Sequence, residues 1–233
     1  MFHSSKTLFV FLTLFTLLSF CKCEDPYQEI YVRFQWPYTD CIFHECPDFP
    51  DSLNYFIIHG IVTRNGSTPV KHCTTKEFNI TKIESIYYQL KAFAGDPYYF
   101  NAPEDLWKKF YDEYGTCLTE YLPTELDYFQ KTLDLRNTYF LESWLRKAGI
   151  VPSDTYPYTY NQYKSTIESH IGKKVAVQCG SKPINGKIFM HVIGICYDDD
   201  FNPTDCSQET IEYEARDCTD MDHMYLFKTN PTL

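Results

Sequence analysis

Long apolar runs are nearly missing from this sequence. The one clear run, Thr7 to Phe20, lies at the start, and no later segment resembles the ~20 apolar residues of a membrane-spanning helix. Linkers rich in Gly, Ser or Pro, internal repeats and low-complexity segments are missing too. The first absence excludes a protein with several membrane spans, and the second excludes a protein built from repeated or linked modules. We expect residues 24–233 to form one domain.

The apolar run at the start has the character of a signal peptide. A short segment that carries Lys6 precedes it, and Cys21-Lys22-Cys23 follows it as a cleavage site. We expect residues 1–23 to be removed and the protein to be secreted, either outside the cell or into the vacuole. An uncleaved anchor is the alternative, but nothing after Cys23 resembles a flank for it.

Positive charge is scarce in the whole chain. The sequence has 21 Lys and Arg against 31 Asp and Glu, which gives a formal net charge of −10. Without residues 1–23 the counts are 19 and 31, and the net charge is −12. This charge has the wrong sign for a general electrostatic attraction to the phosphates of nucleic acids.

Cys-x-x-Cys pairs do not occur in residues 24–233, and no His stands at ligand spacing from two cysteines. Disulfides are therefore expected in preference to zinc. An even number of cysteines in an exported chain predicts complete pairing, here four disulfides. The eight cysteines are Cys41, Cys46, Cys73, Cys117, Cys179, Cys196, Cys206 and Cys218.

Two segments have the acceptor sequence for N-linked glycans. They are Asn65-Gly66-Ser67 and Asn79-Ile80-Thr81, both in polar, turn-like stretches. Such positions suit surface loops of an exported protein, so Asn65 and Asn79 are the predicted glycosylation sites.

Apolar periodicity predicts strands at both ends of the domain and helices between them. Residues 29–36 alternate in polarity and residues 55–62 form a continuous apolar run, as strands do. Further strands are predicted at 174–179, 188–196 and 224–228, and helices at 80–93, 103–114, 124–136, 139–148 and 160–171. The order predicts an α+β fold in which several helices pack around an antiparallel sheet.

Three segments carry a more specific pattern: Phe34-Gln35-Trp36-Pro37, Phe56-Ile57-Ile58-His59-Gly60-Ile61 and Leu106-Trp107-Lys108-Lys109-Phe110-Tyr111-Asp112-Glu113-Tyr114-Gly115-Thr116-Cys117. Together they resemble the T-two ribonuclease family, and its plant S-ribonucleases and S-like ribonucleases most of all. In the family the segment around His59, here the first motif, reads like Ile-His-Gly-Leu-Trp-Pro. The last segment, here the second motif, reads like Phe-Trp-x-His-Glu-Trp-x-Lys-His-Gly-x-Cys.

The order of the cysteines extends this resemblance over nearly all of residues 24–233. It implies the pairs Cys41–Cys46, Cys73–Cys117, Cys179–Cys218 and Cys196–Cys206, which spacing alone does not select from 105 connectivities. It also implies RNA cleavage without a cofactor or metal, in which a 2′-hydroxyl attacks the adjacent phosphorus and a 2′,3′-cyclic phosphate forms. That chemistry needs a general base, a general acid and positive charge at the phosphate.

The residues at the two motifs depart from this pattern. His59 matches the histidine that acts as general acid in the family, and Lys109 stands where many members have His but S-ribonucleases often have Lys. Phe110 replaces the glutamate, Glu113 replaces the lysine, and Tyr114 replaces the second histidine. A tyrosine, with an ordinary pKa of about 10, is a poor general base at the pH where these enzymes work.

Losing a general base costs about 10²- to 10⁴-fold in rate, and losing an electrostatic donor about 10²- to 10³-fold. The sequence therefore predicts a degenerate, catalytically inactive member, a pseudoenzyme. The simplest reading of the second motif is structural, with Trp107, Phe110 and Tyr114 as a buried stripe and Lys109 and Glu113 as an exposed ion pair.

Three functions follow as alternatives. The first is an inactive homologue with a storage or defence role. The second is a module that binds a nucleotide, a glycan or a protein in the vestigial cleft, where Gln35 and Trp36 are the candidates for a base pocket unless Trp36 belongs to the core. The third is a weakly active endonuclease that uses His59 as acid and Glu113 as a substitute base. Neither a membrane nor a metal is an expected partner.

Overall fold

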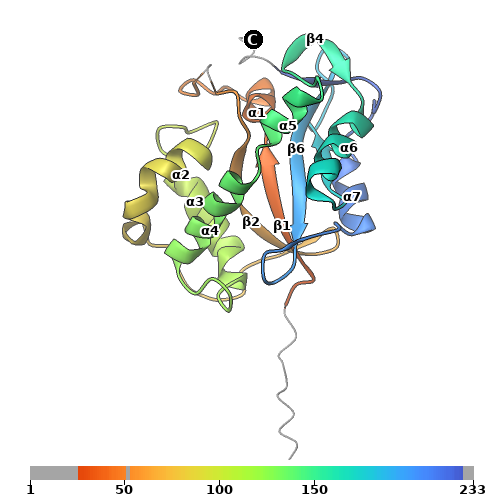
Figure 1. The fold of residues 1–233 in the computed structure, drawn as a ribbon. Helices are drawn as coiled ribbons and strands as arrows, with labels where there is room; N and C mark the ends of the chain where they lie inside the picture. The colour runs from red at the N-terminus through yellow and green to blue at the C-terminus, as the bar shows by residue number, and fades with distance from the viewer. Residues whose placement is uncertain (1–25, 51–52, 228–233) are drawn as a thin grey trace, which may run out of the picture.

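The computed structural model describes residues 26–50 and 53–227, so the predicted signal peptide lies outside the described residues. One sheet runs through the domain, and its longest strand, β6 (Ile188–Tyr197), pairs with four others (Figure 1). The remaining strands are β1 (Glu29–Gln35), β2 (Ile57–Asn65), β3 (Thr68–Val70), β4 (Ser153–Tyr158), β5 (Ala176–Cys179), β7 (Pro203–Thr204) and β8 (Met224–Leu226). Their main path is β3-β2-β1-β6-β8-β4, and β5 and β7 also pair with β6.

The sheet is mixed, so the predicted purely antiparallel sheet is wrong in one pairing. β8 runs parallel to β6, with Ile188 opposite Met224. A parallel neighbour needs a crossover connection, and the chain between the two strands provides one that contains a helix. The α+β class itself is confirmed.

Helices cover the sheet in two groups. Figure 1 shows α2, α3 and α4 together beside β2, and α6 and α7 beside β6. The helices are α1 (Pro37–Phe43), α2 (Tyr87–Phe93), α3 (Glu104–Glu113), α4 (Glu125–Thr138), α5 (Leu141–Lys147), α6 (Tyr160–Ile171) and α7 (Gln208–Ala215), with 3₁₀ turns η1 (Ile80–Ile86) and η2 (Gly115–Cys117). Among the described residues, no helix has the length and apolar character needed to cross a membrane.

The helix α3 carries the second motif and packs its buried aromatic side chains on β2, α2 and α4. Phe110 and Tyr114, which are 8% and 9% exposed, cluster with Val62 of β2. Trp107 has no exposed surface, and its Nε1 donates to Ala94 O at the end of α2 at 2.7 Å. The acidic Glu104 and Asp105 lie in the first turn, where they stabilise the helix by interacting with the positive end of its dipole. The predicted stripe of buried aromatics on this helix therefore describes its packing correctly.

Four disulfides join the pairs Cys41–Cys46, Cys73–Cys117, Cys179–Cys218 and Cys196–Cys206, which are the pairs that the family resemblance implies. The Cys73–Cys117 bridge ties the segment after β3 to the end of the second motif. Cys41–Cys46 joins α1 to the segment that follows it, Cys179–Cys218 joins β5 to the segment after α7, and Cys196–Cys206 joins β6 to the segment after β7.

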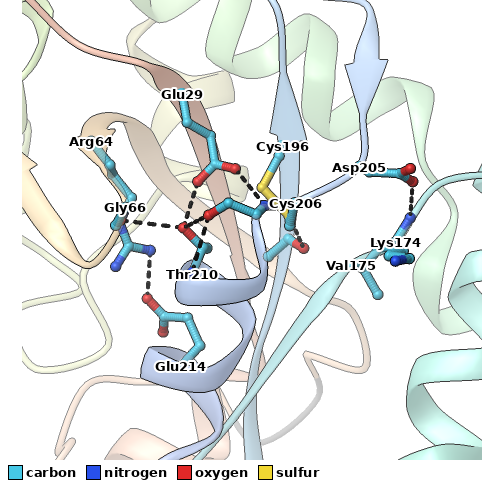
Figure 2. Close-up of a disulfide and its surroundings, with 12 residues drawn as sticks. Glu29, Arg64, Gly66, Lys174, Val175, Cys196, Asp205, Cys206, Thr210 and Glu214 are labelled. Atoms are coloured by element: carbon cyan, nitrogen blue, oxygen red, sulfur yellow. Dashed lines mark hydrogen bonds and ion pairs between the residues drawn. A yellow bond between two sulfur atoms is a disulfide. The ribbon is translucent and has the colours of Figure 1, made fainter.

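Buried polar contacts attach α7 to the first two strands (Figure 2). The Glu29 carboxylate accepts a hydrogen bond from Thr210 Oγ1 at 2.6 Å and another from Ser207 N at 3.0 Å. Arg64 Nη1 pairs with Glu214 Oε1 at 2.7 Å, with both side chains buried. These contacts fix the side chains of α7 relative to the sheet.

Candidate functional site

His59 stands on β2 where the pairing with β1 is irregular. Ile58 lies opposite Phe34, and Ile61 lies opposite Val32, so the register shifts between these pairs, where His59 and Gly60 stand. Gly60 is needed there: a Cβ atom on it would lie 2.7 Å from Tyr128 Oη and 2.9 Å from the Phe110 ring. Tyr128 Oη also donates to Ile61 O at 2.9 Å, which locks α4 onto the first motif.

The second motif meets His59 with an aromatic ring instead of a carboxylate. The rings of Phe110 and His59 lie 5.7 Å apart, edge to face, and Phe110 is 8% exposed. Phe110 also packs against Tyr114 and Val62 in a small apolar cluster. An apolar contact of this kind cannot orient an imidazole or accept its proton.

Glu113 is paired with a lysine from another segment. Lys71 Nζ lies 2.7 Å from Glu113 Oε2 and 5.1 Å from the centre of the Tyr114 ring. The hydrogen bond to Glu113 raises the pKa of Lys71. The predicted ion pair between Lys109 and Glu113 is therefore wrong, because Lys71 is the lysine that Glu113 pairs with, while Lys109 is exposed.

A cluster that sequence reasoning missed lies beside His59. His191 Nε2 is 2.9 Å from Asp40 Oδ1, and Tyr98 Oη donates to the same oxygen at 3.1 Å. Burial alone would raise the pKa of Asp40, but the charge and hydrogen bond of His191, with further contributions from His59 and Tyr98, hold it below its usual value. One signal was present: His191 is the only ionisable side chain in the strand Ile188–Tyr197 apart from its terminal tyrosine.

The surroundings of His59 favour its neutral form. Burial lowers its pKa to about 4, and the charges of Arg33, His191 and Lys109 act in the same direction against the opposing effect of Asp40. Its Nε2 atom is buried and has no hydrogen-bond partner among the described residues.

This environment predicts a pH-dependent stability. The unfolded chain takes up a proton at His59 near pH 6.5 and the folded chain only near pH 4, so stability from this residue is present above pH 6.5 and is lost as the pH falls toward 4. We expect a loss of about 1–2 kcal/mol between pH 7.5 and 5, measured by urea unfolding. His59→Asn should remove this part of the loss, whereas His72→Asn, at an exposed histidine, should keep it. An unchanged slope in His59→Asn would contradict the prediction.

Gln35 and Trp36 are both buried. Trp36 is 1% exposed, and its Nε1 donates to Phe227 O at 2.9 Å. It belongs to the core, and one side lines a small cavity of about 50 Å³ with Phe56 and Leu226. Gln35 is buried and is not among the residues that line this cavity.

The two predicted glycan acceptors are both exposed. Asn65 ends β2, and its Nδ2 donates to Pro26 O at 3.3 Å. Asn79 caps the 3₁₀ turn η1 through its Oδ1, which accepts from Thr81 N at 3.1 Å. This cap uses the Asn79 amide oxygen, not the amide nitrogen to which a glycan would be attached.

Taken together, the α+β fold, the four disulfides and the contact of His59 on β2 with α3 define a ribonuclease type of domain. Residues 27–206 match the family model described as the Ribonuclease T2 family, and the chain belongs to this family.

The chain is similar to several known proteins and solved structures. Ribonuclease S-7 of Nicotiana alata is 29% identical over 85% of this chain and 88% of its own length. The ribonuclease-like storage protein of Panax ginseng is 24% identical over 82% and 79%. The crystal structure of human RNase T2 superposes with a TM-score of 0.71 at 20% identity, over 87% of this chain and all of that chain, and so shows the same fold.

Proposed function

We propose that this protein has the ribonuclease fold but does not cleave RNA. The observation that carries the proposal is the contact of Phe110 with His59, at the position where the family motif has a carboxylate. A buried phenyl ring there leaves the imidazole without a partner that would hold its proton.

Each requirement of the chemistry is weakened. A general acid must be protonated, and with a pKa of about 4 only about 1% of His59 is protonated at pH 6. Glu113 brings negative charge to the position where the family motif has a lysine for the phosphate. Lys71, which follows β3, neutralises this charge but does not take the place of that lysine on α3. Tyr114 supplies a ring that packs on Phe110 instead of a base.

The biological role that fits an inactive, disulfide-rich and acidic domain is storage or defence after export. The name of the ginseng relative, a ribonuclease-like storage protein, supports the first of these roles. Export rests on the predicted signal peptide, with glycans at Asn65 and Asn79.

A second candidate is a weak, cyclising endonuclease with a displaced base. The pair formed by Asp40 and His191 favours it, since a carboxylate that holds an imidazole is a common arrangement for a general base. Glu113, the substitute base expected from the sequence, is already paired with Lys71.

Release of acid-soluble nucleotides from RNA between pH 4 and 8 separates the two candidates. We expect no release by the purified protein above that of its His59→Ala variant, which reports contaminating nuclease. Release that disappears in both His59→Ala and His191→Ala would overturn the proposal and establish the displaced base. Release that disappears only in His59→Ala would overturn it as well, with a different base.

A further inference from the structure

A pocket of about 130 Å³ lies next to the second motif, between the sheet and α7. We call it the arginine pocket and define it by Tyr31, Arg33, Arg64, Tyr114, Glu214 and Arg216, all among its lining residues. His59 is not among the residues that line it. Its volume is several times the ~30 Å³ that one water occupies, so it has room for more than a single water.

The pocket concentrates positive charge in an acidic protein. The chain has five arginines, Arg33, Arg64, Arg136, Arg146 and Arg216, and three of them line this one pocket. Glu214 is the only carboxylate in the lining, and it is paired with Arg64 at 2.7 Å. Arg216 lies 3.8 Å from Asp217 Oδ2, outside the lining, so Arg33 is the lining arginine whose charge is not paired within the described residues.

Arg33 is the cation without a counter-charge. Among residues 26–50 and 53–227, no carboxylate lies within 4 Å of its guanidinium, and Nη2 donates only to the neutral Gln178 Oε1 at 2.9 Å. Its Nε is buried and has no hydrogen-bond partner within the same described residues. A partly buried guanidinium with an open donor is costly unless an anion completes it.

Aromatic rings complete the lining. Tyr31, which is 1% exposed, lines the pocket, and its hydroxyl is buried close to Gly194, which is not a lining residue. Arg64 lies 4.6 Å from the centre of the Tyr31 ring. The rings of Tyr114 and Tyr213 also line the pocket, and Arg216 lies 3.9 Å above the Tyr213 ring.

We propose that the arginine pocket binds a small aromatic anion, whose phosphate or carboxylate group pairs with Arg33 and Arg216 and whose ring packs on Tyr114 or Tyr213. The planar fork of arginine matches both oxyanions, and stacking on tyrosine suits any flat ring. The Glu214 carboxylate repels the charged group and so places it on the Arg33 side of the pocket. The inference does not depend on whether the chain cleaves RNA.

Isothermal titration of the full exported chain at low salt tests the pocket, with phenyl phosphate as the first probe. Benzoate distinguishes the carboxylate from the phosphate, inorganic phosphate measures the contribution of the ring, and phenol measures the contribution of the charge. We expect saturable binding of phenyl phosphate or benzoate that is tighter than that of inorganic phosphate or phenol.

Variants locate the binding. Arg33→Met should weaken it by about 10- to 100-fold, the loss expected for charge-assisted hydrogen bonds. Arg216→Met should weaken binding severalfold, and because this side chain is 46% exposed we expect the variant to fold. The matched control Arg146→Met, also at an exposed arginine, should leave binding unchanged. No binding of any charged probe at millimolar concentration, or equal affinity in Arg33→Met, Arg216→Met and the parent, would overturn the proposal. RNA is not among the probes, so failure here leaves the proposed function untouched.

Discussion

A variant that carries Phe110→Glu, Glu113→Lys and Tyr114→His should release nucleotides from RNA at least about 100-fold faster than the parent protein. The three changes restore the carboxylate, the cation and the second imidazole of the family's second motif. A general base alone contributes about 10²- to 10⁴-fold. The backbone that would present them is already in place, because Trp107 and Tyr111, which have no exposed surface, also hold α3 and are unchanged in this variant.

The carboxylate at position 110 has a further effect in this variant. It would replace a ring whose centre lies 5.7 Å from that of His59, and an anion at that distance raises the pKa of a histidine. The rate of nucleotide release should therefore show a bell-shaped dependence on pH, and its alkaline limb, which reports the general acid His59, should lie above the parent value of about 4. Lys71, whose side chain is 37% exposed, is free to move into solvent when its partner Glu113 is removed.

The same three changes in a His59→Ala background are the matched control and should give no cleavage. If the variant keeps its thermal unfolding transition but remains inactive, the proposed loss of activity does not lie in these three positions alone. The remaining differences are Lys109 in the second motif, and Val62 and Thr63, which stand where the first motif of the family has Trp-Pro.

The second large effect concerns the pair formed by Arg64 and Glu214 under α7. Glu214→Ala should lower the free energy of unfolding by about 3–5 kcal/mol, because it leaves a buried guanidinium without its counter-ion. Arg64 is 2% exposed and lies 4.6 Å from the centre of the Tyr31 ring, so water has little access to it from that side. Equilibrium unfolding in guanidinium chloride at pH 7 measures this loss of stability.

Replacing both partners by apolar side chains is the informative comparison. The double variant Arg64→Met with Glu214→Leu should recover most of the stability, since no unpaired charge remains. A loss below about 1 kcal/mol in Glu214→Ala would mean that water in the arginine pocket solvates Arg64.

The parts of the fold with strong periodicity were predictable from the sequence, and short elements were not. Strands at 29–36 and 188–196 and the helix at 160–171 agree with β1, β6 and α6 within two residues. The helix α1 was missed because Pro37 looks like the end of a strand, yet it occupies the first position of a helix. The helix α7 was missed because its eight residues show little separation of apolar and polar faces, and its position depends on Glu29, which is remote in the sequence.

The candidate site shows the same division. His59 and the four altered residues of the second motif could be placed from their motif positions, and Phe110 does meet His59. The lysine that pairs with Glu113 could not be predicted, because Lys71 comes from a segment 42 residues away that the Cys73–Cys117 bridge holds nearby. Asp40, Tyr98 and His191 come from three segments that only the tertiary fold brings together.

The order of strands has a consequence for synthesis of the chain. β1 lies between β2, which follows it closely, and β6, which ends more than 160 residues later at Tyr197. The sheet cannot close while the ribosome is still making the helical middle of the protein, and such distant pairing folds slowly. Cys41–Cys46 and Cys73–Cys117 can form while the chain is growing, whereas Cys179–Cys218 and Cys196–Cys206 must wait for its last part. Oxidative folding of this protein should therefore pass through a two-disulfide species in which the future centre of the sheet is still open on one edge.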